Sequence, residues 1–98
     1  MEAREATLRE KVSYMAKRNG IVKILDKLAE ECSEYTAAHL KIKNDGMDPR
    51  RALNREEELA DVINLTWQIY DALSEDGKAR IQHLVEEKLD RAAAEQGV

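Results

Sequence analysis

The stretch EEELADVINLTWQIYDAL, residues 56–73, decides the fold of this chain. When it is drawn as a helix at about 100° per residue, its apolar side chains fall on two sides. The first apolar stripe consists of Leu59, Ala60, Ile63, Trp67 and Tyr70. The second apolar side consists of Val62, Leu65, Thr66, Ile69 and Leu73. A helix that is apolar on almost every side of its C-terminal half is predicted to lie in the middle of the fold.

The N-terminal half of the same helix carries acidic residues beside this apolar surface. Glu58 and Asp61 lie next to Leu65 on the second apolar side, so burial of Leu65 is expected to draw both carboxylates inward. A buried carboxylate is costly unless a cation or hydrogen-bond donors compensate its charge. This conflict indicates that the two residues serve a function.

Turn signals divide the preceding residues into two more helices. The first is predicted from about Ala3 to Arg18, where the following Asn19-Gly20 supplies a left-handed stop. The second is predicted from about Ile21 to Lys43, and Asn44-Asp45-Gly46 ends its pattern. The apolar stripe of this second helix consists of Ile21, Ile24, Leu25, Leu28, Cys32, Tyr35, His39 and Ile42.

The ends of the two C-terminal helices have their own signals. Asp48 before Pro49 is typical of a helix start, and Asn54 with Glu57 is an alternative capping pair, so the third helix starts between about 49 and 55. It is expected to end near Leu73. Ser74 is then predicted to cap a fourth helix that reaches about residue 94. The apolar stripe of the fourth helix consists of Ile81, Leu84, Val85, Leu89 and Ala92.

Short connections between successive helices favour antiparallel neighbours. The predicted fold is therefore all-α, an antiparallel bundle of about four helices that forms a single domain over residues 1–98. The helix through residues 56–73 has more apolar surface than three thin partners can cover. Pairing with a second copy, as a homodimer or homotetramer, is expected to complete the bundle.

Composition narrows the classes of function. Of the 98 residues, 43% are hydrophobic and 37% are charged, which is typical of amphipathic helices. The net charge of −4 leaves no basic face for nucleic acid or an anionic membrane. No apolar run is long enough to span a bilayer, the first ten residues are too charged for a signal peptide, and the lone Cys32 is compatible with a reducing compartment. We expect a soluble cytoplasmic protein.

Two acidic clusters carry the candidate chemistry: EECSE at residues 30–34 and EELAD at residues 57–61. Glu31 with Glu34, and Glu58 with Asp61, are spaced three residues apart and so project to the same side of their helices. Across an antiparallel interface, four carboxylates within about 5 Å would repel by roughly 3 kcal/mol per pair at an effective dielectric of 20. A hard divalent cation removes this cost, and without a histidine the site favours Mg²⁺ or Mn²⁺ over zinc. The competing interpretation is a solvated acidic surface.

These clusters resemble the EExxE and ExxD motifs of the all-α nucleoside-triphosphate pyrophosphatase superfamily, which includes MazG-like proteins, dimeric dUTPases, dCTPases and phosphoribosyl-ATP pyrophosphohydrolases. The resemblance covers about 70 residues, through the order of helices, the motif separation and the run DVINLTWQIY. It implies a single MazG-like domain that hydrolyses a nucleoside triphosphate between the α and β phosphates with Mg²⁺. The products would be a monophosphate and pyrophosphate.

The resemblance also implies roles for individual residues. Its metal ligands would be Glu31, Glu34, Glu58 and Asp61. Glu34 or Glu31 is favoured as the residue that activates the attacking water, with Glu30 as an alternative. Lys88 and Arg91 resemble the basic residues that follow the second motif in MazG-like proteins, where phosphate contact is implied; snorkelling of Lys88 out of the core is the alternative. Asn64, one turn after Asp61, is either a substrate-binding amide or an interfacial one.

Other candidate residues receive structural interpretations. At helical spacing, Trp67 and Tyr70 favour core positions over stacking on a base. Cys32 lies on the apolar side between two proposed ligands, which favours a buried thiol. Arg50 and Arg51 could reach substrate from the loop, although a solvated turn is the favoured interpretation.

The sequence supports two hypotheses of function, one for an enzyme and one for a non-enzymatic protein. The first is a cytoplasmic Mg²⁺-dependent nucleotide pyrophosphohydrolase, within which phosphoribosyl-ATP hydrolysis has no supporting feature beyond the shared motifs. The second is a non-enzymatic helical dimerisation module whose acidic faces confer solubility. Binding of Mg²⁺ that depends on Glu58 discriminates between them.

Overall fold

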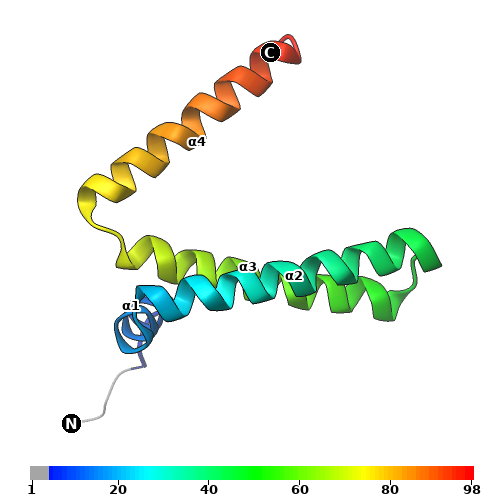
Figure 1. Cartoon of the computed structure of the whole chain (residues 1–98), viewed down its shortest axis with the longest axis horizontal. Helices are drawn as coiled ribbons and strands as arrows, with labels where there is room; N and C mark the ends of the chain where they lie inside the picture. The colour runs from blue at the N-terminus through cyan, green and yellow to red at the C-terminus, as the bar shows by residue number, and fades with distance from the viewer. Residues whose placement is uncertain (1–4) are drawn as a thin grey trace.

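The computed structural model describes residues 5–98, and these residues form four helices and no strand. The helices are α1 (Leu8–Asn19), α2 (Ile21–Asp45), α3 (Pro49–Ala72) and α4 (Glu75–Glu95). Figure 1 shows α2 and α3 side by side, α1 lying across one end of the pair, and α4 leading away from it. The predicted all-α class with four helices is confirmed.

The α2–α3 pair forms the centre of the fold, and its inward residues alternate at spacings of four and three. On α2 the least exposed side chains are Ile24, Leu28, Glu31, Tyr35, Ala38 and Ile42. On α3 the matching series is Arg51, Arg55, Glu58, Val62, Leu65 and Ile69, and Gln68 beside it is the most buried side chain of the helix at 4% exposed. This spacing is that of a left-handed coiled-coil seam between antiparallel helices. We refer to the two series together as the seam.

The first helix starts later than the sequence indicated. It begins at Leu8 because Thr7 forms a capping box with Glu10: the Thr7 hydroxyl accepts from the Glu10 backbone N–H at 3.1 Å, and the Glu10 carboxylate accepts from the Thr7 N–H at 3.2 Å. Residues 5–7 are not helical. The predicted start at Ala3 lies outside the described residues. The predicted stop is confirmed, since Gly20 has φ of 80°.

Helix α3 begins at the earlier of its two candidate sites. The Asp48 carboxylate accepts from the backbone N–H of Arg51 at 2.9 Å, and Pro49 occupies the first helical position. Asn54 lies inside the helix, so it does not cap it. The helix ends at Ala72, close to the predicted end.

Helix α4 starts as predicted, because the Ser74 hydroxyl accepts from the Gly77 N–H at 3.1 Å. Beyond this first turn the helix extends away from α1–α3 and packs little against them (Figure 1). Its apolar stripe is exposed, with Leu84 at 50% and Leu89 at 63%. Within the described residues, nothing covers this stripe.

The two apolar sides of α3 have different surroundings. The second side enters the seam through Val62, Leu65 and Ile69. The first stripe stays outside, and its four large side chains, Leu59, Ile63, Trp67 and Tyr70, are 40–49% exposed. The prediction that Trp67 and Tyr70 occupy the core is therefore wrong within this chain. Periodicity identified the apolar stripe correctly, but the partner that would bury it is not another part of the described chain.

The α2 stripe predicted from the sequence is only partly inward. Ile24 and Ile42 are buried, whereas Leu25, Cys32 and His39 are exposed. The prediction of a buried Cys32 thiol is wrong because the seam is centred on Glu31, about 100° from Cys32 around the helix. Among the described residues, no helix is long and apolar enough to cross a bilayer.

Candidate metal centre

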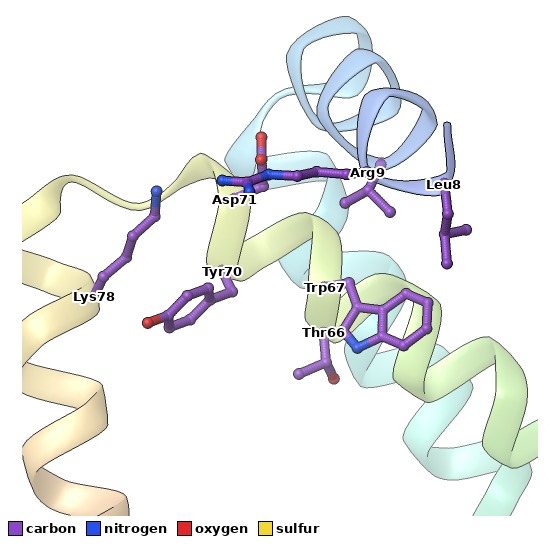
Figure 2. Close-up of a pocket in the computed structure, with 8 residues that line it drawn as sticks. Leu8, Arg9, Thr66, Trp67, Tyr70, Asp71 and Lys78 are labelled. Atoms are coloured by element: carbon purple, nitrogen blue, oxygen red, sulfur yellow. The ribbon is translucent and has the colours of Figure 1, made fainter. Parts of the chain in front are cut away.

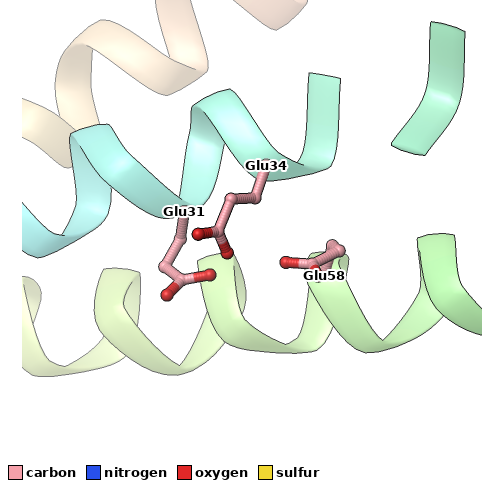
Figure 3. Close-up of side chains that lie close together, drawn as sticks. All are labelled: Glu31, Glu34 and Glu58. Carbon is pink, nitrogen blue, oxygen red and sulfur yellow. The ribbon is translucent and has the colours of Figure 1, made fainter. Parts of the chain in front are cut away.

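The seam brings three glutamates from the two helices to one place. Glu31 and Glu34 extend from α2 toward α3, and Glu58 extends from α3 to meet them (Figure 3). Each contributes a carboxylate oxygen, and these oxygens all lie within 4.8 Å of one another. We refer to these residues as the acidic cluster. Of the four carboxylates predicted to converge, these three lie together, and Asp61 is not one of them.

Helix geometry explains the different exposure of the three side chains. Glu31 occupies an inward position of α2 and is 7% exposed. Glu58 occupies an inward position of α3 and is half-buried. Glu34, three residues after Glu31, projects to the edge of the seam and is exposed. The acidic cluster is therefore buried at Glu31 and open to solvent at Glu34.

The charge of the cluster disfavours ionisation of its most buried member. The pKa of the Glu31 carboxyl is raised above its ordinary value, chiefly because Glu34 hydrogen-bonds to it. Burial and the negative charges of Glu34 and Asp61 act in the same direction, while a hydrogen bond from Lys27 opposes them. Without a bound metal ion, the ionised form of Glu31 is therefore disfavoured.

Two carboxylate oxygens in this cluster lack any hydrogen-bond partner. Glu31 Oε2 and Glu58 Oε2 are both buried, and no donor among residues 5–98 reaches them. A buried acceptor without a partner costs about 1–3 kcal/mol, and more if it is charged. A divalent cation that prefers oxygen ligands would compensate buried acceptors of this kind. Three carboxylates without a histidine or thiol fit Mg²⁺ or Mn²⁺ better than zinc.

Lys27 is a neighbour of the site that sequence reasoning missed. Its ammonium lies 3.5 Å from Glu31 Oε1 and 3.4 Å from Glu30 Oε2. The hydrogen bond and charge of Glu30 are the main reasons why the pKa of Lys27 is raised. The signal in the sequence was the spacing of four residues between Lys27 and Glu31, which places the two side chains on the same face. This ammonium partly neutralises Glu31, but it leaves Glu31 Oε2 without a partner.

Asp61 lies at the border of the acidic cluster. It is close enough for its charge to raise the pKa of Glu31, yet it is exposed and is not one of the three residues whose oxygens converge. One turn further along, Asn64 Oδ1 accepts from Gln68 Nε2 at 3.1 Å. Asn64 is itself exposed, so its amide nitrogen remains accessible from solvent.

Lys88 and Arg91 are not brought to the acidic cluster within the described chain. Both lie on α4, which leads away from the α2–α3 pair (Figure 1). The Arg91 guanidinium lies 3.6 Å from Glu87 on the same helix, and both basic side chains are exposed. Lys88 lies within the exposed apolar stripe of α4, which no other part of residues 5–98 covers. Any contact with substrate would require α4 to meet the cluster of another copy.

Comparisons of the chain with models of protein families, with curated proteins and with solved structures found no match. The three convergent carboxylates of the acidic cluster, two of them with buried and unpartnered oxygens, form an oxygen-rich site for a hard cation.

Proposed function

We propose that the chain is a Mg²⁺-dependent nucleotide pyrophosphohydrolase that cleaves a nucleoside triphosphate between the α and β phosphates. The observation that carries this proposal is the pair of buried, unpartnered oxygens on Glu31 and Glu58, which come from different motifs and lie beside Glu34. Glu31, Glu34 and Glu58 would hold the metal, with Asp61 at its border. The choice of reaction rests on the resemblance of the two motifs to the MazG-like pattern.

The roles of the residues follow from their exposure. A bound Mg²⁺ supplies Lewis-acid stabilisation of phosphoryl charge and a more acidic water. The exposed Glu34 carboxylate is better placed than Glu31 to accept a proton from the attacking water, since Glu31 is buried. Water oxygen forms a bond to the α-phosphorus, the bond from that phosphorus to the bridging oxygen breaks, and pyrophosphate leaves with the electron pair. The products are a nucleoside monophosphate and pyrophosphate.

We further propose that the protein acts in the cytoplasm as a homodimer or homotetramer. The support is the exposed apolar stripe of α3, together with the uncovered stripe of α4. Trp67 and Tyr70 line a cavity of about 590 Å³ between α1, α3 and the start of α4 (Figure 2). Exposed contiguous apolar surface of this kind is typical of a protein interface.

Calorimetric titration with Mg²⁺ tests the metal centre directly. The wild-type protein is expected to bind Mg²⁺, and Glu58→Gln is expected to abolish binding. Glu56→Gln is the matched control, because Glu56 is exposed on the same helix and lies outside the cluster. A screen of ribo- and deoxyribonucleoside triphosphates with a pyrophosphate assay then tests the reaction. Release of orthophosphate, or no Mg²⁺ binding, would contradict the proposal.

The uncovered apolar stripes favour a second candidate, a non-enzymatic helical dimerisation module. In that case the acidic cluster would only prevent unwanted association, and Glu58→Gln would change neither Mg²⁺ binding nor the oligomeric state. The unpartnered buried oxygens argue against this candidate, because surface carboxylates kept for solubility remain hydrated.

A further inference from the structure

A cavity with basic side chains lies at the turn between α2 and α3, beyond the acidic cluster. It has a volume of about 570 Å³ and is lined by Ala38, Lys41, Asp48, Arg50, Arg51 and Asn54. We refer to it as the basic cavity. Three of its six side chains are cationic in a protein whose net charge is −4. This local reversal of charge next to the proposed metal centre is its distinctive property.

The basic cavity adjoins the acidic cluster on both helices. Ala38 lies one turn after Glu34 on α2, and Asn54 lies one turn before Glu58 on α3. Lys41 follows Glu34 by seven residues, so the two side chains project to the same side of α2 about 10 Å apart. The acidic cluster and the basic cavity are therefore consecutive segments along one side of the α2–α3 pair.

The cations of the basic cavity differ in how they are engaged. Arg51 donates to the carbonyl oxygens of Asp45 and Gly46 at 3.0 Å each and lies 3.4 Å from Asp48. It therefore holds the turn, and it neutralises the one carboxylate of the cavity. Lys41 and Arg50 are exposed and have neither an ion pair nor a side-chain hydrogen bond within residues 5–98. Both are free to bind an anion.

The opposite end of the acidic cluster is less suited to anions. A smaller cavity of about 180 Å³ there is lined by Asn19, Lys23, Ile24, Lys27 and Leu65. Lys27 is already paired with Glu30 and Glu31, so Lys23 is the single unengaged cation of this cavity among the described residues. Two apolar side chains contribute to its lining. The difference in free cationic side chains between the two cavities therefore favours phosphate at the Lys41 end of the α2–α3 pair.

We propose that the basic cavity binds the β and γ phosphates, so that Lys41 and Arg50 hold the pyrophosphate that leaves. This inference rests on the proposed function, and it adds an orientation for the substrate: phosphates toward the α2–α3 turn and nucleoside toward α1. Lysine and arginine bind phosphate oxygens through charge-assisted hydrogen bonds. Two such contacts would stabilise the charge that develops on the departing pyrophosphate.

Binding of inorganic pyrophosphate in the presence of Mg²⁺ tests the orientation by calorimetry. Lys41→Gln and Arg50→Gln are each expected to weaken pyrophosphate binding by about tenfold, which is the loss of one charge-assisted hydrogen bond. Lys43→Gln is the matched control, because Lys43 is exposed on the other side of α2 and does not line the cavity. Lys23→Gln is the control at the α1 end. Neither control is expected to change pyrophosphate binding.

Two further measurements separate this inference from the proposed function. Mg²⁺ binding without pyrophosphate, and nucleoside monophosphate binding with Mg²⁺, are expected to be unchanged in Lys41→Gln and Arg50→Gln. Unchanged pyrophosphate binding in both variants, or weakening by Lys23→Gln instead, would overturn the orientation while intact Mg²⁺ binding left the proposed function standing. No Mg²⁺ binding in the wild-type protein would overturn the proposed function itself. Circular dichroism of each variant would test whether its helices are retained.

Discussion

At the scale of single residues, Glu31 occupies an inward position at which side chains stabilise the α2–α3 pair, but its buried carboxylate destabilises the fold. It takes an inward position in the seam, where its neighbours on α2 are Leu28 and Tyr35, and it carries a carboxylate without a full set of partners. Removing its charge while keeping its shape is therefore expected to help the fold and to harm the metal centre. Such opposition between stability and function is typical of active sites.

The variant Glu31→Gln tests this opposition. In the absence of metal it is expected to raise Tm, because a buried group that resists ionisation is replaced by a neutral amide. Its Mg²⁺ affinity is expected to fall by more than the roughly 10–100-fold that loss of an outer-shell partner causes. Thermal unfolding and Mg²⁺ titration measure the two effects, with Glu56→Gln as the control. A lower Tm for Glu31→Gln in metal-free buffer would contradict this account of its burial.

The raised pKa of Glu31 also predicts a dependence on pH. A carboxyl group whose pKa is higher in the folded state than in the unfolded state stabilises the fold below its ordinary pKa, and this contribution disappears as the pH rises through the raised value. Metal-free protein should lose stability over that interval relative to Glu31→Gln. Mg²⁺ affinity should increase over the same interval, because binding must displace the proton. Unfolding curves and Mg²⁺ titrations at a series of pH values test both trends.

At the scale of helices, the caps determine where each element begins. Asp48→Ala removes the side-chain acceptor at the start of α3 and is expected to destabilise the fold by about 1 kcal/mol. Asn54→Ala should be neutral or slightly stabilising, since Asn54 lies inside the helix and alanine has the higher helix propensity. Urea unfolding distinguishes the two variants. A greater loss for Asn54→Ala would mean that α3 starts one turn later.

Most helix limits could be predicted from the sequence because the signals are local. Gly20, Asp48 with Pro49, and Ser74 each mark a boundary that the structure confirms. The start of α1 was wrong because the Thr7–Glu10 capping box was overlooked in favour of the charged residues before it. The seam was harder to predict, since both sides of α3 are apolar and periodicity cannot decide which side faces α2.

The candidate site could be predicted in part from the sequence. Matched spacing and an antiparallel α2–α3 pair predicted that Glu31, Glu34, Glu58 and Asp61 converge; the first three do, and Asp61 lies at the border. Lys88 and Arg91 could not be placed, because their position depends on the direction that α4 takes after Ser74. That direction is set by tertiary contacts, which the local pattern of α4 does not contain.

At the scale of the whole molecule, α4 leaves the large side chains of its apolar stripe exposed. An isolated 21-residue helix has little stability in water, so an exposed apolar stripe on α4 indicates a partner. Leu84→Glu is expected to shift the protein from an oligomer toward the monomer and to make Tm depend less on concentration. His83→Glu is the control, because His83 lies outside the stripe. Light scattering after gel filtration measures the change, and a wild-type monomer at all concentrations would contradict the assembly.

Glu31 and Glu58 occupy inward positions of the seam, and their carboxylates weaken the packing of α2 against α3 there. On α2, Ile24 and Leu28 pack into the seam on one side of the acidic cluster, and Ala38 and Ile42 pack into it on the other. The contact between α2 and α3 is therefore expected to be weakest in the middle, at the acidic cluster. Metal-free protein should therefore open locally at this point before it unfolds globally. Backbone amides near Glu31 and Glu58 should exchange their hydrogens faster than those at either end, and saturating Mg²⁺ should slow them. Such an ion would hold α2 and α3 together, and the hydrogen-exchange rates of these amides would report whether it is bound.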